Sequence, residues 1–300
     1  MDDGIASANS VGSTIEATCA TMGGRASGRR VSVGAWVGAG LVGLVCLAAL
    51  SSFVWTPQDP LFTDTAVRLQ APSSSHWLGT DRLGRDVLSN IMAGTRITLL
   101  VGLIVVAVGA GLGVPLGMLA ATHGGRLGET LGRGFDLLLA FPGLLLAIIF
   151  AAAFGASSLA AALALGIGAV PGFARVARAA SLQALTQGYI KAARVSGRSG
   201  WQIAFQHVLP NIASNVLVQA SVAFGLAVLA EAGLSYLGLG TPPPTPSWGR
   251  MLQDGQAFLG THLYLVLAPG SAIAVAVLGF NLLGDGLRDL LDPRLRDRDG

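Results

Sequence analysis

Charged residues are scarce in this sequence. Only 12% of its 300 residues are Asp, Glu, Lys or Arg, whereas a soluble domain has about 25%. Hydrophobic residues make up 52%, and the mean hydropathy is +0.63. This composition excludes an ordinary soluble protein and predicts an integral membrane protein. The pI of 9.3 is only a weak sign of nucleic-acid binding, because the few basic residues lie between apolar runs, and no nucleic-acid partner is expected.

Lysine and cysteine are almost missing. Lys191 is the only lysine, and it stands between Ile190 and Ala192, so the Gly-Lys-Ser/Thr core of a phosphate-binding loop does not occur. The chain is therefore not expected to hydrolyse ATP by that route. Two cysteines cannot make a disulfide framework. Cys19 lies in the polar N-terminal stretch, and Cys46 lies in the first apolar run, where a small buried role is expected.

Long apolar runs predict an all-α protein with six transmembrane helices. Residues 137–174 carry no charge, and an unbroken helix of that length would measure about 57 Å against a hydrocarbon core of about 30 Å. This run is therefore predicted to hold two spans separated by a turn at residues 155–158. The other four spans are expected at residues 33–55, 97–121, 212–233 and 263–283.

The distribution of Lys and Arg predicts the orientation. With the N-terminus inside, 14 of the 19 basic residues fall in inner segments and five in outer segments. Both termini are then cytoplasmic. The predicted order is a disordered cytoplasmic tail (1–30), a first transmembrane segment (31–58), an extracytoplasmic segment (59–96), a core (97–285) and a cytoplasmic tail (286–300). The core is expected to contain a cytoplasmic loop (186–211) and an extracytoplasmic loop (239–262).

Residues 189–211, YIKAARVSGRSGWQIAFQHVLPN, join two apolar runs but are too long for a simple turn. Ala193 and Gly197 are four apart and are expected to share a helix face. Pro210 cannot continue an earlier helix but is tolerated in the first turn of a new one. We therefore expect a short surface helix, a break, and then a fresh spanning helix. The stretch also holds Arg194 and Arg198, predicted to share a second face, and the apolar Trp201, Ile203 and Phe205.

This stretch resembles the EAA loop of bacterial ABC importer permeases, in which Glu-Ala-Ala is followed by Gly and later by His-Ile-Leu-Pro-Asn. In that family the loop forms a coupling helix in a groove of the ATP-hydrolysing subunit. Lys191 stands where the family usually has Glu, which removes or reverses any salt bridge from this position. The alternative is an ordinary loop with chance small residues. The resemblance implies these coupling residues: Lys191, Ala192, Ala193, Arg194, Gly197, Ile203, His207, Leu209, Pro210 and Asn211.

Three other stretches resemble the peptide and nickel branch of the same permeases. Residues 76–86, HWLGTDRLGRD, look like its HxLGTDxxGRD signature, and residues 234–249 and 280–294 are similar to the same branch. Their order is typical of its C-type subunit, which pairs with a B-type one. The resemblance implies the type I ABC importer transmembrane fold. It also implies these extracytoplasmic motif residues: Gly79, Thr80, Asp81, Gly84, Arg85, Asp86, Pro246 and Trp248.

The polar residues of these motifs allow more than one role. Asp81, Arg82, Arg85 and Asp86 alternate in sign between glycines, and a structured, internally paired outer turn is preferred over direct contact with substrate. His76, Asp81 and Asp86 could also be metal ligands, but no closed ligand set is visible. The proline-rich loop is expected to present Trp248 to a delivery protein, or else to cap the bundle. Glu231, an acid at membrane depth, is either a functional residue or one paired at the interface.

The resemblance implies half of a translocation path in the bacterial cytoplasmic membrane, working by alternating access. The implied partners are a B-type permease, two ATP-binding subunits that hold ATP and Mg²⁺, an extracytoplasmic binding protein and the lipid bilayer. The chain itself is expected to be non-catalytic and to bind no cofactor or metal. The sequence leaves the cargo open among dipeptides, longer peptides, nickel and metal chelates, and it does not identify the pore-lining residues.

Two other functions are compatible with parts of the sequence. Residues 197–200 fit a rhomboid-like GxSG pattern, but Ser199 lies in a basic loop, whereas an intramembrane protease needs a histidine near the serine within the membrane. A secondary transporter driven by an ion gradient usually carries ionisable groups at mid-membrane. The spans here are nearly free of charge, which argues against ion coupling.

Overall fold

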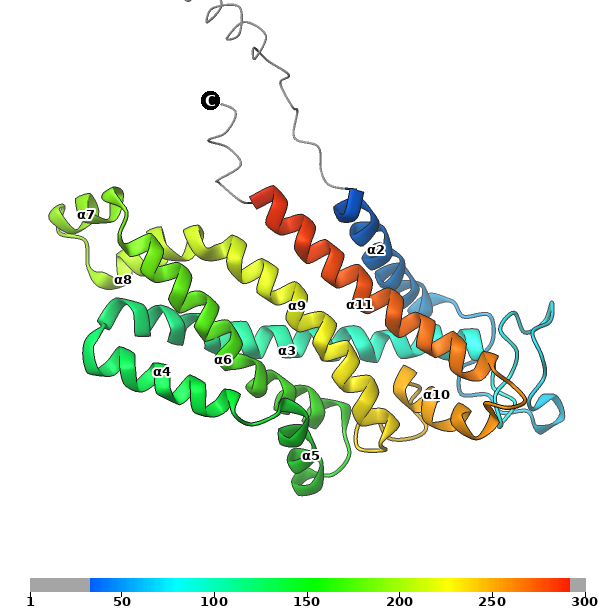
Figure 1. Ribbon diagram of the computed structural model, residues 1–300. Coiled ribbons are helices and arrows are strands. Elements are labelled where there is room, and N and C mark those ends of the chain that lie inside the picture. The colour runs from blue at the N-terminus through cyan, green and yellow to red at the C-terminus, as the bar shows by residue number, and fades with distance from the viewer. Residues whose placement is uncertain (1–32, 292–300) are drawn as a thin grey trace, which may run out of the picture. The chain divides into compact units, whose positions relative to one another are not determined.

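The computed structural model describes residues 33–291, and this part of the chain is built from helices joined by turns (Figure 1). The long helices are α2 (Val33–Val54), α3 (Val87–His123), α6 (Ser158–Leu185), α9 (Leu209–Tyr236) and α11 (Tyr264–Leu291). Shorter helices are α4 (Gly125–Leu139), α5 (Gly143–Phe154), α7 (Gly188–Val195), α8 (Gly200–Ile203) and α10 (Trp248–Gly255). Single turns of other helix types lie at Thr65–Val67, Ala204–Val208 and Gln256–Phe258.

The most extensive helix contact runs between α3 and α6. Gly109, Gly113 and Gly117 lie four apart on the face of α3 that meets α6. A Cβ atom at Gly113 would lie 2.5 Å from the carbonyl oxygen of Val170, and one at Gly117 would lie 2.2 Å from that of Ala174. Small residues at this spacing let helix backbones approach closely in membranes. These glycines therefore let the backbones of α3 and α6 pack closely.

Helix α11 packs against α2 on one side and α9 on the other, which completes the bundle. The outward side of α2 is apolar: Leu47, Leu50 and Phe53 are 65–69% exposed. Such a surface is unfavourable in water and is suited to lipid. Cys46, expected to be buried, is only partly buried on this helix.

Six spans are predicted, and the described residues contain five or six, the difference lying in the middle of the chain. Five described helices are long and apolar enough to cross a membrane; a sixth crossing exists only if α4 and α5, which meet at a 75° bend, count as one span. The uncharged run does break after Phe154, as expected. However, α5 has 12 residues, or about 18 Å, which is shorter than the hydrocarbon core. The bend at residues 140–142 divides the helical residues that would otherwise form one long span.

Two predicted boundaries also move. Helix α3 begins at Val87 rather than near residue 97, because the Asp86 side chain caps it by accepting a hydrogen bond from the backbone N–H of Ser89. Helix α11 continues to Leu291 and so includes the first residues of the predicted C-terminal tail, 286–300. The predicted disordered N-terminal tail and the placement of both termini fall on residues 1–32 and 292–300, outside the described residues.

Candidate functional site

The short helix expected in the 186–211 loop exists as α7, and its side chains divide sharply by exposure. Ile190 is fully buried in an apolar cluster that includes Phe173 of α6 and Val208 at the base of α9. Lys191, Ala192 and Arg194 are exposed, and Ala193 is partly buried. One apolar side chain therefore anchors a helix whose opposite side is open.

Gly197 does not lie on the face of α7, so the prediction that it shares a face with Ala193 is wrong. The helix ends at Val195, and Gly197 follows it with φ +77°. The Arg198 N–H donates to the Ala193 carbonyl at 3.2 Å, and the Gly197 N–H donates to the Arg194 carbonyl at 3.0 Å. This pair of bonds is the Schellman motif, which favours glycine at the left-handed position. Arg198 lies beyond the helix for the same reason and shares no face with Arg194.

The break in the chain comes earlier than predicted. The expected break near Pro210 is absent, and a continuous helical run extends from Gly200 to Tyr236. Residues 204–208 form a π-turn in which the Leu209 N–H donates to the Ala204 carbonyl. This wider turn accommodates a proline that lacks an N–H. The actual break is at residues 196–199, where Ser199 and Gln202 form a capping box that starts α8.

His207 and Asn211, at the end of the motif, contact α7. The Asn211 side-chain amide donates to the Tyr189 hydroxyl, and the His207 ring lies edge-on to the Tyr189 ring with centroids 6.3 Å apart. Ile203 is buried in the same cluster as Ile190, whereas Leu209 is partly buried and Pro210 is exposed. Sequence analysis did not single out Tyr189 and Ile190 as the anchors. The signal was available, since they are an aromatic and an aliphatic residue at the start of a basic helix.

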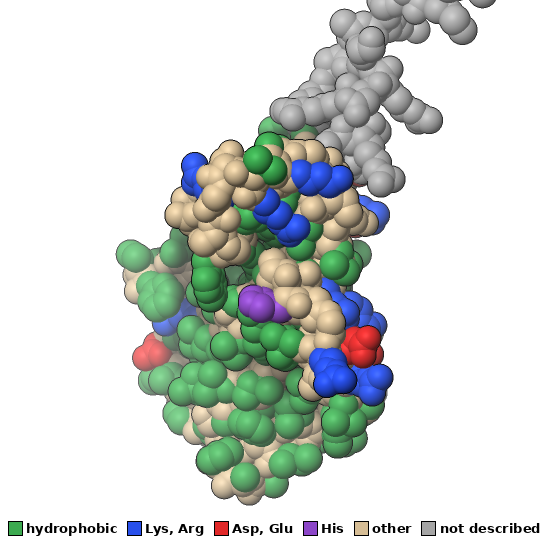
Figure 2. Space-filling view, turned by 90° about the vertical axis from the view of Figure 1, so that its left-hand side faces the viewer, with side chains coloured by type: hydrophobic (Ala, Val, Ile, Leu, Met, Phe, Trp, Pro, Cys, Tyr) green, Lys and Arg blue, Asp and Glu red, His purple; other side chains and the backbone are tan. Residues whose placement is uncertain are grey.

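The exposed surface around α7 is basic and apolar. Figure 2 shows Lys and Arg side chains over the segment at the top of this face and hydrophobic side chains below it. Val195 is 90% exposed, and Trp201 and Phe205 stack on each other with centroids 5.2 Å apart while remaining more than half exposed. Trp201 and Phe205 border a cavity of about 330 Å³ between α3 and the start of α8. Trp201 and Phe205 therefore belong to the helical run of α9 and not to the short surface helix.

The far end of the bundle carries the second set of predicted residues, in the turn before α3. The Asp81 carboxylate accepts hydrogen bonds from the N–H groups of Leu83 at 2.7 Å and Arg85 at 2.9 Å. Burial is the main influence on the Asp81 carboxyl and raises its pKa, against the opposing effect of these two bonds and the nearby Arg85 charge. Gly84 backs directly onto the carbonyl of Asp64, which leaves no room for a Cβ atom.

Thr80 and Asp86 close this turn as an isolated antiparallel bridge. Thr80 is fully buried; its hydroxyl accepts from the Gln70 N–H and donates to the Val67 carbonyl. The Tyr264 hydroxyl at the start of α11 lies 3.0 Å from the Thr80 carbonyl and 2.9 Å from that of Gln70. Gly79 occupies the other corner of the turn, against the Tyr264 ring. The turn is structured by its own hydrogen bonds, as predicted, but no ion pair forms among Asp81, Arg82, Arg85 and Asp86: Asp86 pairs with His76, and Arg82 with Asp254.

The imagined metal set is not assembled. His76 Nδ1 lies 3.1 Å from Asp86, whose other carboxylate oxygen accepts from the Ser89 N–H and hydroxyl. The Asp81 carboxylate is instead bound by backbone groups of its own turn. Across residues 33–291, no group of three or more His, Cys, Asp or Glu side chains could hold a metal ion.

Trp248 is not presented to the outside, so that prediction is wrong. It is 2% exposed, its indole N–H donates to the Ile91 carbonyl at 3.0 Å, and its ring packs against Gly94 of α3. The preceding loop turns inward because Ser247 is buried and caps α10. Pro246 is partly buried beside it. Trp248 therefore packs into the bundle, while Pro243, Pro244 and Thr245 of the loop remain exposed.

Glu231 is buried and hydrogen-bonded at the end of α9. Its Oε1 accepts from the Ser235 hydroxyl at 2.7 Å and the Thr241 hydroxyl at 3.2 Å. Its Oε2 has no hydrogen-bond partner within the part of the chain that the structure describes. The acid therefore holds the loop after α9 in place, as the paired interpretation predicted.

Ser199, the candidate nucleophile of the protease hypothesis, is exposed and occupied as a helix cap. Its hydroxyl accepts from the Gln202 N–H, and its own N–H donates to the Gln202 side chain. His207 contacts Tyr189, not Ser199. This geometry is that of a capping box and offers no base for a serine nucleophile.

Known proteins similar to this chain agree with the motifs. Residues 113–297 match the family described as binding-protein-dependent transport system inner membrane component. The chain is 40% identical over 261 residues to the dipeptide transport system permease protein DppC of Alkalihalophilus pseudofirmus, covering 85% of this chain and 86% of that protein. It is 42% identical over 269 residues to DppC of Escherichia coli, covering 88% and 90%.

Two further comparisons extend this result. The chain is 43% identical over 227 residues to the glutathione transport system permease protein GsiD of Pectobacterium atrosepticum, covering 76% of this chain and 75% of that protein. Its fold is similar to that of a chain of the MetNI methionine ABC transporter in an inward-facing conformation. The TM-score is 0.57 at 20% identity, with 67% and 96% of the two chains covered. The chain belongs to the family of binding-protein-dependent inner-membrane transport components, and it has the fold of an ABC importer transmembrane subunit.

Proposed function

We propose that this chain forms half of the translocation path of an ATP-driven peptide importer, with α7 and the turn after it docking on a separate ATP-hydrolysing subunit. The observation that best supports docking at α7 is that one side of this helix is buried in the bundle and the other side is exposed. Ile190 is 0% exposed in a cluster built from α3, α6 and α9, while Lys191, Ala192 and Arg194 point away from the bundle. A partner bound to the exposed side would therefore contact a helix whose other side is packed in the core.

Movement of α7 would pass to the spanning helices by two contacts. Ile190 is buried in the same apolar cluster as Ala184 near the end of α6, and Tyr189 contacts His207 and Asn211 at the base of α9. Packed apolar contacts do not compress easily, so a displaced helix carries its neighbours with it. ATP-dependent closure of the partner subunits would then tilt α6 and α9 and open the path alternately to the two sides.

The cargo we propose is a peptide, because relatives that cover most of this chain are named as permeases for dipeptides and for glutathione, itself a peptide. The proposed partners are a second, B-type permease, two ATP-binding subunits that hold ATP and Mg²⁺, and an extracytoplasmic binding protein. In this arrangement α7 lies on the cytoplasmic side and α10 on the extracytoplasmic side. The chain itself supplies no catalytic residue.

Site-directed cross-linking tests the docking surface. In a background with Cys19→Ser and Cys46→Ser, Ala192→Cys on exposed α7 is expected to form a cross-link to the co-purifying ATP-binding subunit. Thr261→Cys, exposed at the other end of the bundle, is the matched control and is expected to form none. Peptide uptake into vesicles and ATP hydrolysis are measured on the same preparations.

Two results would contradict the proposal. Equal cross-linking from both positions would show that α7 is not the docking surface. Uptake that stops with a proton-gradient uncoupler while ATP stays high would favour a gradient-driven transporter.

A further inference from the structure

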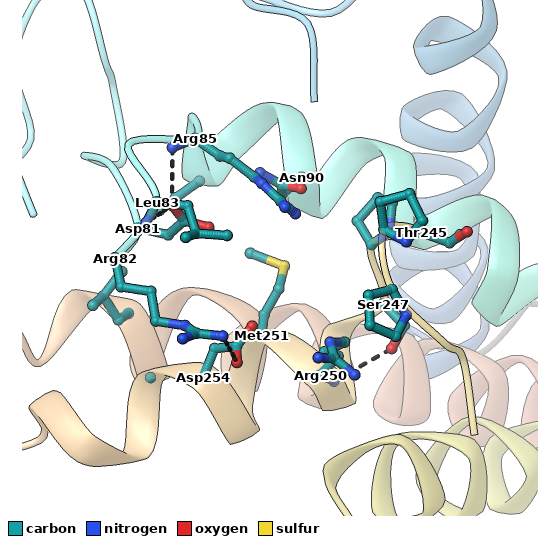
Figure 3. A pocket seen from close by; sticks show the side chains of 16 residues that line it. Asp81, Arg82, Leu83, Arg85, Asn90, Thr245, Ser247, Arg250, Met251 and Asp254 are labelled. Carbon is teal, nitrogen blue, oxygen red and sulfur yellow. Dashed lines mark hydrogen bonds and ion pairs between the residues drawn. The ribbon is translucent and has the colours of Figure 1, made fainter. Parts of the chain in front are cut away.

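A cavity of about 290 Å³ lies at the α10 end, between the turn that precedes α3 and the start of α10. Figure 3 shows Arg85 approaching it from the α3 side and Arg250 from α10, with Met251 between them. Prolines 243, 244 and 246 form a stiff further wall. The volume is close to the lower limit, about 300 Å³, of typical small-molecule sites.

The two acidic side chains of this cavity already have partners. Asp254 pairs with Arg82, with 3.0 Å between the carboxylate oxygen and the guanidinium nitrogen. Asp81 accepts two backbone hydrogen bonds within its own turn. Among the described residues, no carboxylate oxygen lies within 4 Å of the guanidinium of Arg85 or Arg250, and the Arg85 charge acts on Asp81 only from a greater distance.

Arg85 and Arg250 are half-buried, and their guanidinium groups form no hydrogen bond or ion pair with any residue from 33 to 291. The Nε of Arg85 is also shielded from solvent. A buried donor without a partner costs about 1–3 kcal/mol. The fork of a guanidinium group matches a carboxylate, which accepts paired hydrogen bonds from it, and this cavity is lined by two such groups.

We propose that this cavity binds the C-terminal carboxylate of a short peptide through Arg85 and Arg250. The proposal rests on the peptide importer function proposed above. Asn90 also lines the cavity; its amide N–H₂ donates to the Asp86 carbonyl at 2.9 Å, and its amide oxygen remains to accept a peptide N–H. Met251 and Leu265 offer apolar surface to a side chain. The shielded Arg85 Nε and the small volume favour a small molecule over a side chain from a docked protein.

Binding of a matched ligand pair tests the proposal without a variant. The assembled transporter in lipid nanodiscs, without its binding protein, is titrated at low salt with labelled Ala-Ala and with Ala-Ala amide. The two differ in the terminal carboxylate. We expect Ala-Ala to bind at least tenfold more tightly, and the difference to shrink as salt screens the charges. Equal affinity for the two ligands, or no binding of either, would overturn the proposal.

Variants then assign the carboxylate to the two arginines. Arg85→Gln and Arg250→Gln are each expected to weaken Ala-Ala binding at least tenfold. The control is the double variant Arg82→Gln with Asp254→Asn, which removes the existing ion pair from the same cavity without changing its net charge; a change below about threefold is expected. An equal loss in the control would overturn the assignment.

The failure of this site and the failure of the importer proposal are distinguishable. If Ala-Ala does not bind here, but binding-protein-dependent peptide uptake persists in both arginine variants, the cavity proposal is wrong and the importer proposal stands. If the wild-type transporter takes up no peptide at all, the importer proposal is wrong. If the arginine variants impair only the affinity of the binding protein for the transporter, the cavity receives that protein's acidic side chain, and the peptide site is overturned.

Discussion

The turn before α3 and the turn after α7 lie at opposite ends of the bundle and differ in how far their residues are buried and hydrogen-bonded within the chain. At the α10 end, Thr80, Asp86 and Trp248 are all buried and hydrogen-bonded within the described residues. At the α7 end, Val195 is 90% exposed, and a Cβ atom at Gly197 would meet nothing within 4 Å. The turn before α3 and Trp248 are held by internal contacts, whereas α7 has one fully buried side chain, Ile190, and an open opposite side. An interface with a partner is expected where the chain leaves apolar surface uncovered.

The largest test of this contrast replaces one tryptophan at each end. Trp248→Ala removes a buried ring and its hydrogen bond to the Ile91 carbonyl, and should lower the free energy of unfolding by about 3–5 kcal/mol. Trp201→Ala removes an exposed ring stacked only on Phe205 and should cost about 1 kcal/mol or less. Thermal unfolding of the two variants in detergent measures the difference. Equal destabilisation would abolish the contrast.

Gly197→Ala addresses the turn after α7. Its φ of +77° is unfavourable for alanine and should cost about 1–2 kcal/mol locally. Because this turn is exposed, we expect the midpoint of global unfolding to change little, while cross-linking of α7 to the ATP-binding subunit and ATP-driven uptake fall several-fold. Gly200→Ala, three residues on in open space at the first position of α8, is the control and should retain both. Normal coupling in Gly197→Ala would show that the turn geometry is not needed.

The raised pKa of Asp81 allows the α10 end to be tested by the pH dependence of the unfolding free energy. Its pKa in the folded protein is raised above the ordinary 3.8 by burial, so the protonated form is favoured on folding. The stabilisation is fully present below the ordinary pKa and is lost as pH rises through the raised value. Asp81→Asn keeps an oxygen for the Leu83 and Arg85 N–H groups but cannot titrate. The difference in unfolding free energy between wild type and this variant should therefore depend on pH in the range above 3.8, and a constant difference would contradict it.

The smallest expected effect on stability is that of Lys191→Glu, which restores the residue usual in the family. Lys191 is exposed and forms no ion pair with the described part of the chain, so stability should change by less than about 0.5 kcal/mol. If α7 docks on an ATP-binding subunit adapted to a lysine, reversing this charge should lower uptake about two- to tenfold, more strongly at low salt. An unchanged uptake would place Lys191 outside the interface.

Sequence patterns predicted the long apolar helices and the break before Ser158, because these depend on local composition and on helix length. They missed the start of α3 at Val87, because polar side chains such as Ser89 and Arg96 interrupt the apolar pattern in residues 87–96. The cap formed by Asp86 was a readable local signal. So was the capping box of Ser199 and Gln202, which marks the break before α8.

Other features depend on contacts distant in sequence and could not be predicted. Trp248 is buried because it meets Ile91 and Gly94 on α3, more than 150 positions away. A proline-rich loop before a tryptophan is equally compatible with an outward ring. The cavity that brings Arg85 and Arg250 together likewise depends on how α10 folds back beside α3.

The π-turn at residues 204–208 has a consequence for the surface of α9. An α-helix advances by about 100° per residue, and a π-turn contains one residue more than an α-turn, so it shifts the angular register of everything that follows. A helical wheel drawn continuously from Gly200 would therefore assign side chains after Leu209 to a face about 100° from their true direction. Removing one residue from this turn would let it close as an ordinary α-turn, and the side chains of α9 would keep their direction. The directions in which the side chains of α9 point are thus set at its base. This base lies beside α7, the segment proposed to receive the motion of the ATP-binding subunit.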